Sequence, residues 1–128
     1  MTIIVGLTGG IASGKTTVVK FLKKKRFAIH DSDAVVKKIY IKPSPSFIKF
    51  LKRIKLGNAI NGLKINKAVI RDEIFNNLSK RRKLEKHIHI EVKKSRDRFL
   101  KKHKKSKIVL LDIPLLFENK LEKICDYT

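Results

Sequence analysis

Residues 9–16 read Gly-Gly-Ile-Ala-Ser-Gly-Lys-Thr, and this octet decides the fold that the sequence predicts. It matches the pattern G-x-x-x-x-G-K-[ST], in which successive backbone N–H groups turn inward around a polyphosphate. A short β-branched run at 2–7 precedes the octet and predicts a buried strand, and a helical pattern over 14–25 follows it. Because strand, loop and helix occur in the required order, we expect the chain to bind a nucleoside triphosphate.

Three residues at the end of this loop have distinct expected roles. The ammonium group of Lys15 would reach the β- and γ-phosphates, and the hydroxyl of Thr16 would bind a magnesium ion that bridges the same phosphates. Thr17 would hydrogen-bond the α-phosphate. The helix that begins here supports these roles, because its free N–H groups and its dipole favour anions.

Length and composition predict one globular domain. The chain has 128 residues, of which 42% are hydrophobic, enough to supply a core. No apolar stretch approaches the roughly 20 residues that span a bilayer, and no basic segment precedes the first apolar run, so we expect a cytoplasmic protein without a membrane partner. The single cysteine, Cys125, excludes an internal disulfide framework, and we interpret it as a buried small hydrophobe in a strand.

The charge is strongly positive. Lys and Arg number 32 against 11 Asp and Glu, which gives a net charge of +21. Such a field attracts polyanions of any kind, so non-specific nucleic-acid binding is permitted. Specific nucleic-acid recognition is not expected, because lysine predominates over arginine and few aromatic residues lie among the basic ones. We interpret the runs at 23–26 and 101–105 as solvated surface near helix ends, where cations complement the dipole. The sequence does not specify an oligomeric state.

The remaining periodicity predicts an α/β fold with a parallel sheet flanked by helices. Strands are expected at 2–7, 27–30 and 108–111, with a further one beginning at 124–128, and helices at 14–25, 34–41, from 46 onward, 66–78 and 79–105. Residues 57–62 are expected to form a loop, and Asn66 to cap the helix that follows. The apolar positions expected to face inward from the last two helices are Val69, Ile70, Ile74 and Phe75, then Leu84, Ile88, Val92, Phe99 and Leu100.

Three acidic residues follow predicted strands. Asp31 and Asp33 come after the second strand, and Asp112 ends the third. Because the carboxyl ends of parallel strands share one edge, we expect these groups to converge there. A kinase needs such a set, in which one carboxylate orients the proton of the attacking hydroxyl and others hold magnesium-bound water. The alternatives are that Asp31 or Asp33 caps the next helix and that Asp112, before Pro114, forms a turn.

Three motifs together resemble the dephospho-coenzyme A kinase family. They are residues 6–16, which contain the phosphate loop, Asp31-Ser32-Asp33, and residues 112–118, which read Asp-Ile-Pro-Leu-Leu-Phe-Glu. Their order and spacing match the family. Weaker similarities are Ile70-Arg71 with Phe75, and Leu84-Glu85 with His89. The chain departs from the family pattern at Asn66-Lys67, where the family has an Asp-Arg pair, and at Ile90, where it has a proline.

The resemblance implies transfer of the γ-phosphoryl group of ATP to the ribose 3′-hydroxyl of dephospho-coenzyme A, with magnesium. It implies a P-loop kinase-type sheet with a helical acceptor-side subdomain at about 42–106. By analogy, the residues that bind ATP are Gly10, Ala12, Ser13, Gly14, Lys15, Thr16 and Thr17, with Thr16 on the metal. Lys15 and Asp33 are the implied catalytic residues, and those implied for the acceptor are Asp33, Arg71, His89, Asp112, Leu116 and Glu118.

The family pattern continues with a fourth strand, a lid that carries arginines and an adenine-contacting segment. The resemblance therefore covers the N-terminal portion of the family, and we expect the chain alone to lack the C-terminal strands and lid. Two other functions fit the residues. One is a different P-loop small-molecule kinase, such as a nucleoside monophosphate kinase, and the other is a basic nucleic-acid-binding protein that keeps a relic phosphate loop.

Overall fold

The computed structural model describes residues 2–7, 15–112 and 125. The chain divides into two compact units. One, which we call the sheet unit, consists of Met1–Asp33 and Lys94–Thr128, and the other, which we call the helical unit, is Ala34–Lys93. The sequence predicted a helical segment of about 42–106, whereas the helical unit begins and ends earlier in the chain.

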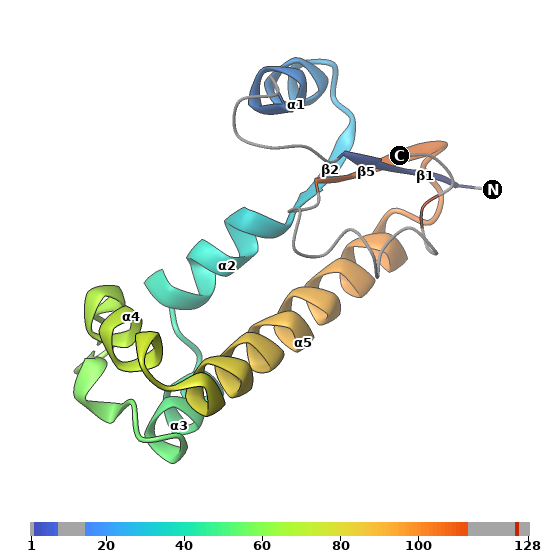
Figure 1. The fold of residues 1–128 in the computed structure, drawn as a ribbon. Helices are drawn as coiled ribbons and strands as arrows, with labels where there is room; N and C mark the ends of the chain where they lie inside the picture. The colour runs from blue at the N-terminus through green and yellow to red at the C-terminus, as the bar shows by residue number, and fades with distance from the viewer. Residues whose placement is uncertain (1, 8–14, 113–124, 126–128) are drawn as a thin grey trace. The chain divides into compact units, whose positions relative to one another are not determined.

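The sheet unit contains three parallel strands. These are β1 (Ile3–Leu7), β2 (Ala28–Asp31) and β5 (Ile108–Asp112), in the order β1-β5-β2 (Figure 1). Val109, Leu110 and Leu111 of the central strand are buried. The strand reads as a continuous apolar run because a central parallel strand is covered on both faces. The predicted parallel α/β class and the three predicted strands are confirmed, each strand lying within one residue of its expected bounds.

Helix α1 (Lys15–Lys24) connects β1 to β2 and closes with a left-handed turn. Arg26 has φ 64°, the Arg26 N–H donates to the Lys23 carbonyl at 3.0 Å, and the Phe27 N–H donates to the Leu22 carbonyl at 3.2 Å. This pair of bonds is a Schellman cap, which satisfies carbonyls that the helix end leaves open. The last turn carries Lys23 and Lys24, whose charges complement the helix dipole.

The remaining helices are α2 (Ser32–Ile41), α3 (Pro45–Arg53), α4 (Lys67–Phe75) and α5 (Leu78–Lys102). Side chains that precede three of them accept hydrogen bonds from the first turn. The Ser44 hydroxyl accepts from the Phe47 N–H, the Asn66 carbonyl from the N–H groups of Ala68 and Val69, and the Asn77 carbonyl from the Lys80 N–H. The predicted cap at Asn66 is confirmed.

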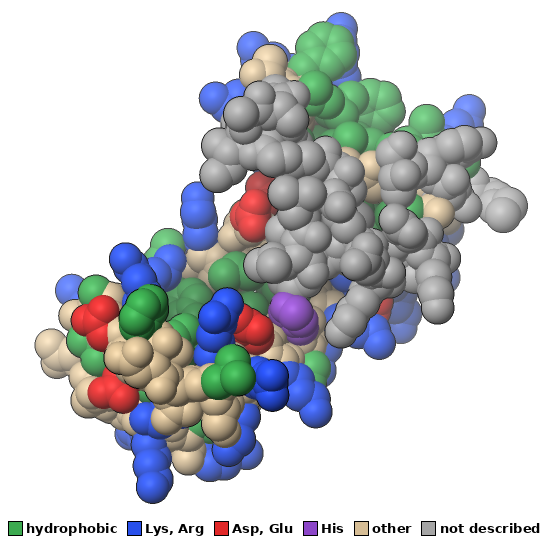
Figure 2. Space-filling view, in the orientation of Figure 1, with side chains coloured by type: hydrophobic (Ala, Val, Ile, Leu, Met, Phe, Trp, Pro, Cys, Tyr) green, Lys and Arg blue, Asp and Glu red, His purple; other side chains and the backbone are tan. Residues whose placement is uncertain are grey.

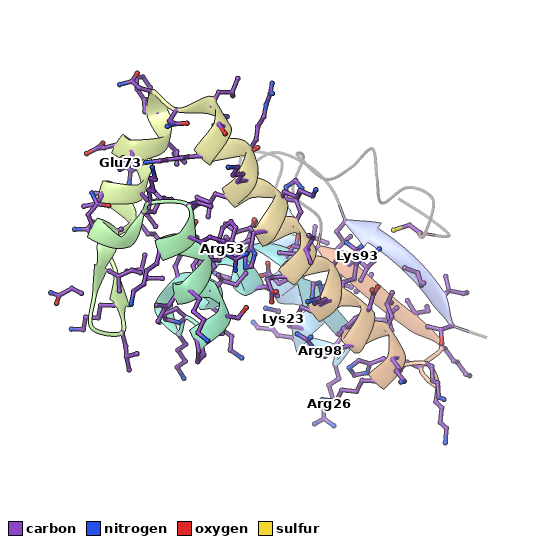
Figure 3. All side chains as sticks on the ribbon, turned by 90° about the horizontal axis from the view of Figure 1, so that it is seen from below. Lys23, Arg26, Arg53, Glu73, Lys93 and Arg98 are labelled. Atoms are coloured by element: carbon purple, nitrogen blue, oxygen red, sulfur yellow. The ribbon has the colours of Figure 1, made fainter. Side chains whose placement is uncertain are left out.

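Surface charge is spread widely. In Figure 2, Lys and Arg side chains lie over much of the visible face. Charged side chains also project from α5, and Arg98 is one of them (Figure 3). Among the described helices, none combines the length and the apolar character needed to cross a membrane.

Two sequence predictions for the helical unit are wrong. Residues 57–62 are not a loop, because a 3-10 turn at Gly57–Ala59 leads into a hairpin of β3 (Ile60–Asn61) and β4 (Lys64–Ile65). Gly62 has φ 65°, a conformation that glycine adopts readily and that such tight turns need.

The other error concerns Phe75, which was expected to face inward but is 83% exposed. Helix α4 ends at this residue instead of continuing to 78, because Asn77 caps the start of α5. The last turn of α4 therefore points its aromatic side chain into solvent. The other expected inward residues of α4 do pack, with Ile70 buried and Val69 and Ile74 against the same cluster.

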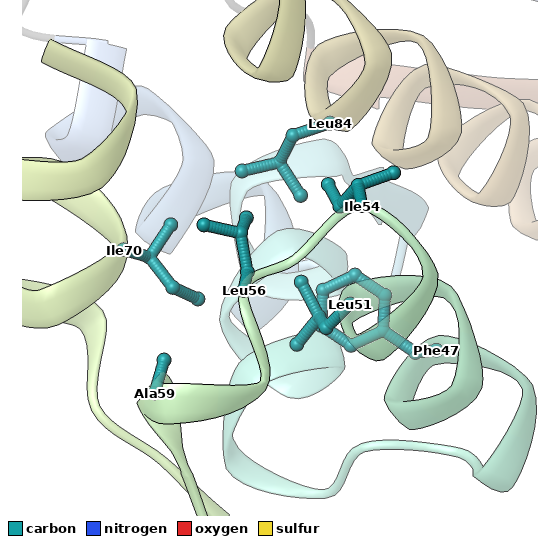
Figure 4. Close-up of a cluster of buried hydrophobic side chains, with 7 residues drawn as sticks. All are labelled: Phe47, Leu51, Ile54, Leu56, Ala59, Ile70 and Leu84. Carbon is teal, nitrogen blue, oxygen red and sulfur yellow. The ribbon is translucent and has the colours of Figure 1, made fainter. Parts of the chain in front are cut away.

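The core of the helical unit joins α3, α4, α5 and the turn after α3. Its buried residues are Phe47, Leu51, Ile54, Leu56, Ala59, Ile70 and Leu84 (Figure 4). A second Schellman cap shapes this core, since Lys55 has φ 64° and the Leu56 N–H donates to the Leu51 carbonyl at 2.8 Å. Leu51 and Leu56 are both fully buried, so the cap fixes two adjacent parts of the core.

The core of the sheet unit contains buried polar side chains beside its apolar ones, and two of them are His30 and Arg96. Leu111 packs against Ile4, Phe99, Leu100 and Cys125. Near them, His30 is 6% exposed and Arg96 is 9% exposed. The His30 Nε2 and Ser95 Oγ atoms lie 3.1 Å apart, within hydrogen-bond distance, which links β2 to α5. Cys125 is half-buried, and the rest of the strand predicted at 124–128 lies outside the described residues.

Burial is the main cause of the pKa shifts of His30 and Arg96. Burial lowers the pKa of His30, the nearby positive charge of Arg96 lowers it further, and Asp31 opposes both effects. Burial also lowers the pKa of Arg96, while Asp97 and Cys125 oppose that shift. His30 is therefore held in its neutral form more firmly than an exposed histidine.

Replacing Leu51 by alanine should destabilise the chain by about 2–5 kcal/mol, because it removes a fully buried side chain and leaves a cavity. Urea denaturation measures the change. Leu63→Ala is the matched control, since Leu63 is 76% exposed and its truncation should cost less than about 0.5 kcal/mol. Equal losses for the two variants would contradict the assignment of the core.

Stability should fall as the pH drops below the ordinary histidine value of 6.5, because the unfolded chain then takes up a proton that buried His30 resists. The loss begins near the unfolded pKa and continues until the pH passes the lower folded pKa. In His30→Leu this component should vanish, so the free energy of unfolding should depend less on pH in that window. His103→Gln, which keeps His30, is the control, and an unchanged slope in His30→Leu would refute this account.

Candidate functional site

The carboxyl ends of the three strands form one edge of the sheet, which we call the carboxyl edge. In the parallel register, Asp112 lies opposite Leu7 on one side and opposite Asp31 on the other. Neighbouring strands lie about 4.8 Å apart, so the two aspartates are adjacent. Asp112 is buried and Asp31 is half-buried. The expected convergence of these two carboxyl groups is confirmed, and their chemical roles stay predictions.

Asp33 belongs to the segment that leaves this edge. Helix α2 begins at Ser32, directly after β2, and Ser32 is 2% exposed. Asp33 is the second residue of the helix and is exposed to solvent. Asp33 therefore does not occupy the position that precedes and caps the helix. Its negative charge lies in the first turn, where it interacts favourably with the positive end of the helix dipole. The same position leaves its carboxyl group accessible to a reacting molecule.

In the sequence, the phosphate-loop residues lie between β1 and α1. Strand β1 ends at Leu7 and α1 begins at Lys15, so the positive end of the α1 dipole and its free N–H groups face the loop. Lys15, Thr16 and Thr17 form the first turn of the helix. The other predicted phosphate-binding residues, Gly10, Ala12, Ser13 and Gly14, lie outside the described residues.

The four remaining predicted site residues are placed less completely. Arg71 is exposed on α4 and His89 is half-buried on α5, both in the helical unit. Leu116 and Glu118 lie outside the described residues. The structure thus brings together Asp31 and Asp112, and the roles of all the predicted site residues stay predictions.

The structure adds His30 and Arg96, which the sequence interpretation missed. His30 directly precedes Asp31 and interacts with it electrostatically. Within the described part of the chain, the Nδ1 atom of His30 and the Nε atom of Arg96 have no hydrogen-bond partner. A signal for Arg96 was present in the sequence, since the apolar stripe of α5 repeats every four residues up to Val92 and position 96 is its next member.

A separate hollow lies in the helical unit. It has a volume of about 500 Å³ and is open to solvent, and its lining residues are Val69, Asp72, Glu73, Asn76 and Asn77. Glu73, labelled in Figure 3, accepts hydrogen bonds from Lys80 and Asn58, which hold the pKa of this carboxyl group below its usual range. Of the predicted site residues that the structure describes, none lines the hollow.

No group of three or more His, Cys, Asp or Glu side chains in the described part of the chain is arranged to hold a metal ion. The carboxyl edge nevertheless offers aspartate oxygens, the ligand type that magnesium prefers.

Comparison with known proteins identifies the family. The family model described as dephospho-CoA kinase matches residues 3–128. Among curated relatives, a dephospho-CoA kinase of Fusobacterium nucleatum is 40% identical over 126 residues, which cover 96% of this chain and 63% of the relative. A dephospho-CoA kinase of Oceanobacillus iheyensis is 35% identical over 133 residues, which cover 100% of this chain and 65% of the relative. The chain therefore spans less than two thirds of the length of these relatives.

Solved structures agree in fold. A protein from Thermus thermophilus superimposes with a TM-score of 0.78 and 29% identity, covering 98% of this chain and 62% of that protein. The dephospho-CoA kinase of Campylobacter jejuni superimposes with a TM-score of 0.79 and 24% identity, covering 99% of this chain and 65% of that protein. This likeness supports the fold. From the family match over residues 3–128, the chain belongs to the dephospho-CoA kinase family.

Proposed function

We propose that the chain carries the phosphate site and part of the acceptor site for transfer of the γ-phosphoryl group of ATP to the ribose 3′-hydroxyl of dephospho-coenzyme A. The observation that carries the proposal is the register at the carboxyl edge, where Asp112 lies between Asp31 on one side and Leu7, the end of β1, on the other. The phosphate-loop sequence begins at Gly9, two residues after the end of that strand. Nucleotide phosphates and acidic groups would therefore meet at one edge, as phosphoryl transfer requires.

The phosphate groups would be held by the loop and the first turn of α1. Backbone N–H groups around Gly10, Ala12, Ser13 and Gly14 would surround the β- and γ-phosphates. Lys15 would place a positive charge on the same phosphates, and Thr17 would bind the α-phosphate. Phosphoryl transfer depends mainly on such positioning and charge stabilisation, because the protein forms no covalent bond to the transferred group.

Magnesium fits the donor set of this edge. Thr16 offers a hydroxyl, and Asp31 and Asp112 offer carboxyl oxygens. When bound, magnesium would neutralise charge on the phosphates. Since the described residues hold no complete metal cluster, phosphate oxygens and water would supply the remaining ligands, as is usual for magnesium in kinases.

Asp33 is the proposed base that orients the attacking hydroxyl. It lies two residues after Asp31 and is exposed, so a substrate hydroxyl can reach it without displacing the core. A carboxylate at hydrogen-bond distance from that hydroxyl would accept its proton during transfer. Arg71, His89, Leu116 and Glu118, together with Asp112, are the proposed contacts to the acceptor.

Purified chain supplied with ATP, magnesium and dephospho-coenzyme A should release ADP, and Lys15→Ala should lower the acceptor-dependent rate on the order of a hundredfold or more. The control Lys20→Ala changes an exposed lysine on the same helix and should retain the rate. Adenosine monophosphate in place of dephospho-coenzyme A should not stimulate release. Stimulation by the monophosphate, or a rate that does not depend on Lys15, would contradict the proposal.

Asp33→Asn should lower kcat strongly and leave the KM for ATP nearly unchanged, because Asp33 is proposed to act on the hydroxyl during transfer and not on the nucleotide. Steady-state kinetics with varied ATP separates the two effects. The control Asp97→Asn removes an exposed carboxyl group from α5. A raised KM with unchanged kcat would assign Asp33 to binding instead of to catalysis.

A further inference from the structure

The edge of the sheet unit opposite the carboxyl edge gathers two basic runs that are far apart in the sequence. We call it the amino edge, because the three strands begin there. Residues 20–27 lead from α1 into β2, and residues 98–108 lead from α5 into β5. Residues 20–27 contain five Lys and Arg, residues 98–108 contain six, and neither segment contains Asp or Glu. All eleven of these cationic side chains are exposed.

Backbone contacts confirm that the two runs meet. Ala28 pairs with Val109, so the segments that enter β2 and β5 are neighbours across the sheet. The Ile3 N–H donates to the Lys107 carbonyl at 2.8 Å, and the Thr2 hydroxyl donates to the Lys104 carbonyl at 2.7 Å. The start of β1 is thereby tied to the second basic run. Figure 3 labels Lys23, Arg26 and Arg98, which belong to the two runs.

Helix capping accounts for only part of this charge. Lys23 and Lys24 complement the end of α1, and Lys101 and Lys102 complement the end of α5. Lys104, Lys105 and Lys107 lie beyond the helix, where the dipole effect has faded. Collecting this many like charges without a carboxylate in either segment is unfavourable for the free chain, and an anionic partner would relieve the repulsion.

Apolar side chains lie among these cations. Ile3, Phe27 and Ile108 stand at the starts of the three adjacent strands and are 39%, 39% and 38% exposed. The register pairs Ile3 with Ile108, and Phe27 precedes the pair of Ala28 with Val109, so the three form a row across the sheet. An exposed apolar row flanked by lysines matches the chemistry of a bilayer surface, which offers anionic head groups and an apolar layer beneath them.

We propose that the amino edge of the sheet unit binds the surface of an anionic lipid bilayer. Within the described residues the edge consists of helix ends and strand starts, and no described helix or ribbon lies along it to enter a nucleic-acid groove. Nine of its eleven cations are lysines, which act as point charges toward head groups and lack the planar fork with which arginine recognises bases and phosphates. Surface binding requires no membrane-spanning helix, but it departs from the expectation from the sequence that there is no membrane partner.

The chain contains no tryptophan, so the fluorescence of a single introduced tryptophan reports only on the position where it is placed. In Phe27→Trp the fluorescence should shift to shorter wavelength on addition of vesicles of phosphatidylglycerol and phosphatidylcholine in equal parts, and should not shift with phosphatidylcholine alone. Phe75→Trp is the matched control, because Phe75 is 83% exposed and belongs to the helical unit. It should show no shift with either vesicle.

Charge variants test the same edge by vesicle co-sedimentation. Replacing Lys23, Lys24 and Lys25 by glutamine should weaken binding on the order of a hundredfold, since each basic residue near an anionic surface contributes about fivefold. Replacing Lys101, Lys102 and Lys105 should act similarly, and circular dichroism checks that both variants fold. The control with the same charge change replaces exposed Lys49, Lys83 and Lys86 of the helical unit.

Three results would overturn the proposal. The first is absence of binding to phosphatidylglycerol vesicles at low salt. The second is equal weakening in the control variant, which would show that net charge alone is responsible. The third is a change in Phe27→Trp fluorescence with an RNA duplex at lower concentration than with vesicles, which would assign the edge to nucleic acid.

Discussion

The parallel pairing of β5 with both β1 and β2 is the constraint on which the sheet unit depends. Strands β1 and β2 follow each other in the sequence, yet each hydrogen-bonds to β5 and not to the other. In the sequence, the whole helical unit therefore lies between the two outer strands and the central one. Because Val109 and Leu111 are fully buried, inserting β5 supplies the apolar core that the two outer strands lack.

This pairing also separates two kinds of charge. Parallel strands place all their ends at one edge and all their starts at the other. Asp31 and Asp112 lie where strands end, while the basic runs at 23–26 and 101–105 lie where strands begin. The acidic groups of the sheet are thus kept at the edge where β1 ends, and the proposed magnesium would offset their repulsion of a nucleotide. The lysine-rich ends are kept on the far side of the same sheet.

Local patterns in the sequence were sufficient to predict most of this arrangement. The apolar runs at 2–7 and 108–111 and Asn66 each specify a structure through nearby residues, so strand and cap positions followed. The convergence of Asp31 and Asp112 could be predicted because parallel topology alone fixes which strand ends meet. Motif order also sufficed for the family, since three separate motifs agreed.

Features that depend on tertiary packing were missed. The hairpin at 60–65 has strands of two residues each, too short to produce a periodic signal. Phe75 looked like a core residue because it continued an apolar pattern, but the cap at Asn77 ends that helix first. The burial of His30 and Arg96 depends on how α5 packs under β2, and polar residue types carry a strong expectation of exposure. The roles of Asp33, Arg71 and His89 depend on a bound substrate, which no pattern in the sequence specifies.

The most direct test of the central claim is where a nucleotide binds, and amide chemical shifts measured by NMR during titration with magnesium and ATP locate it. The account predicts that the shifts concentrate at the carboxyl edge, on Leu7, Lys15–Thr17, Asp31 and Asp112. Shifts concentrated instead on the basic runs at 23–26 and 101–107 would contradict it, because they would show that ATP is attracted by charge alone and not bound by the phosphate loop.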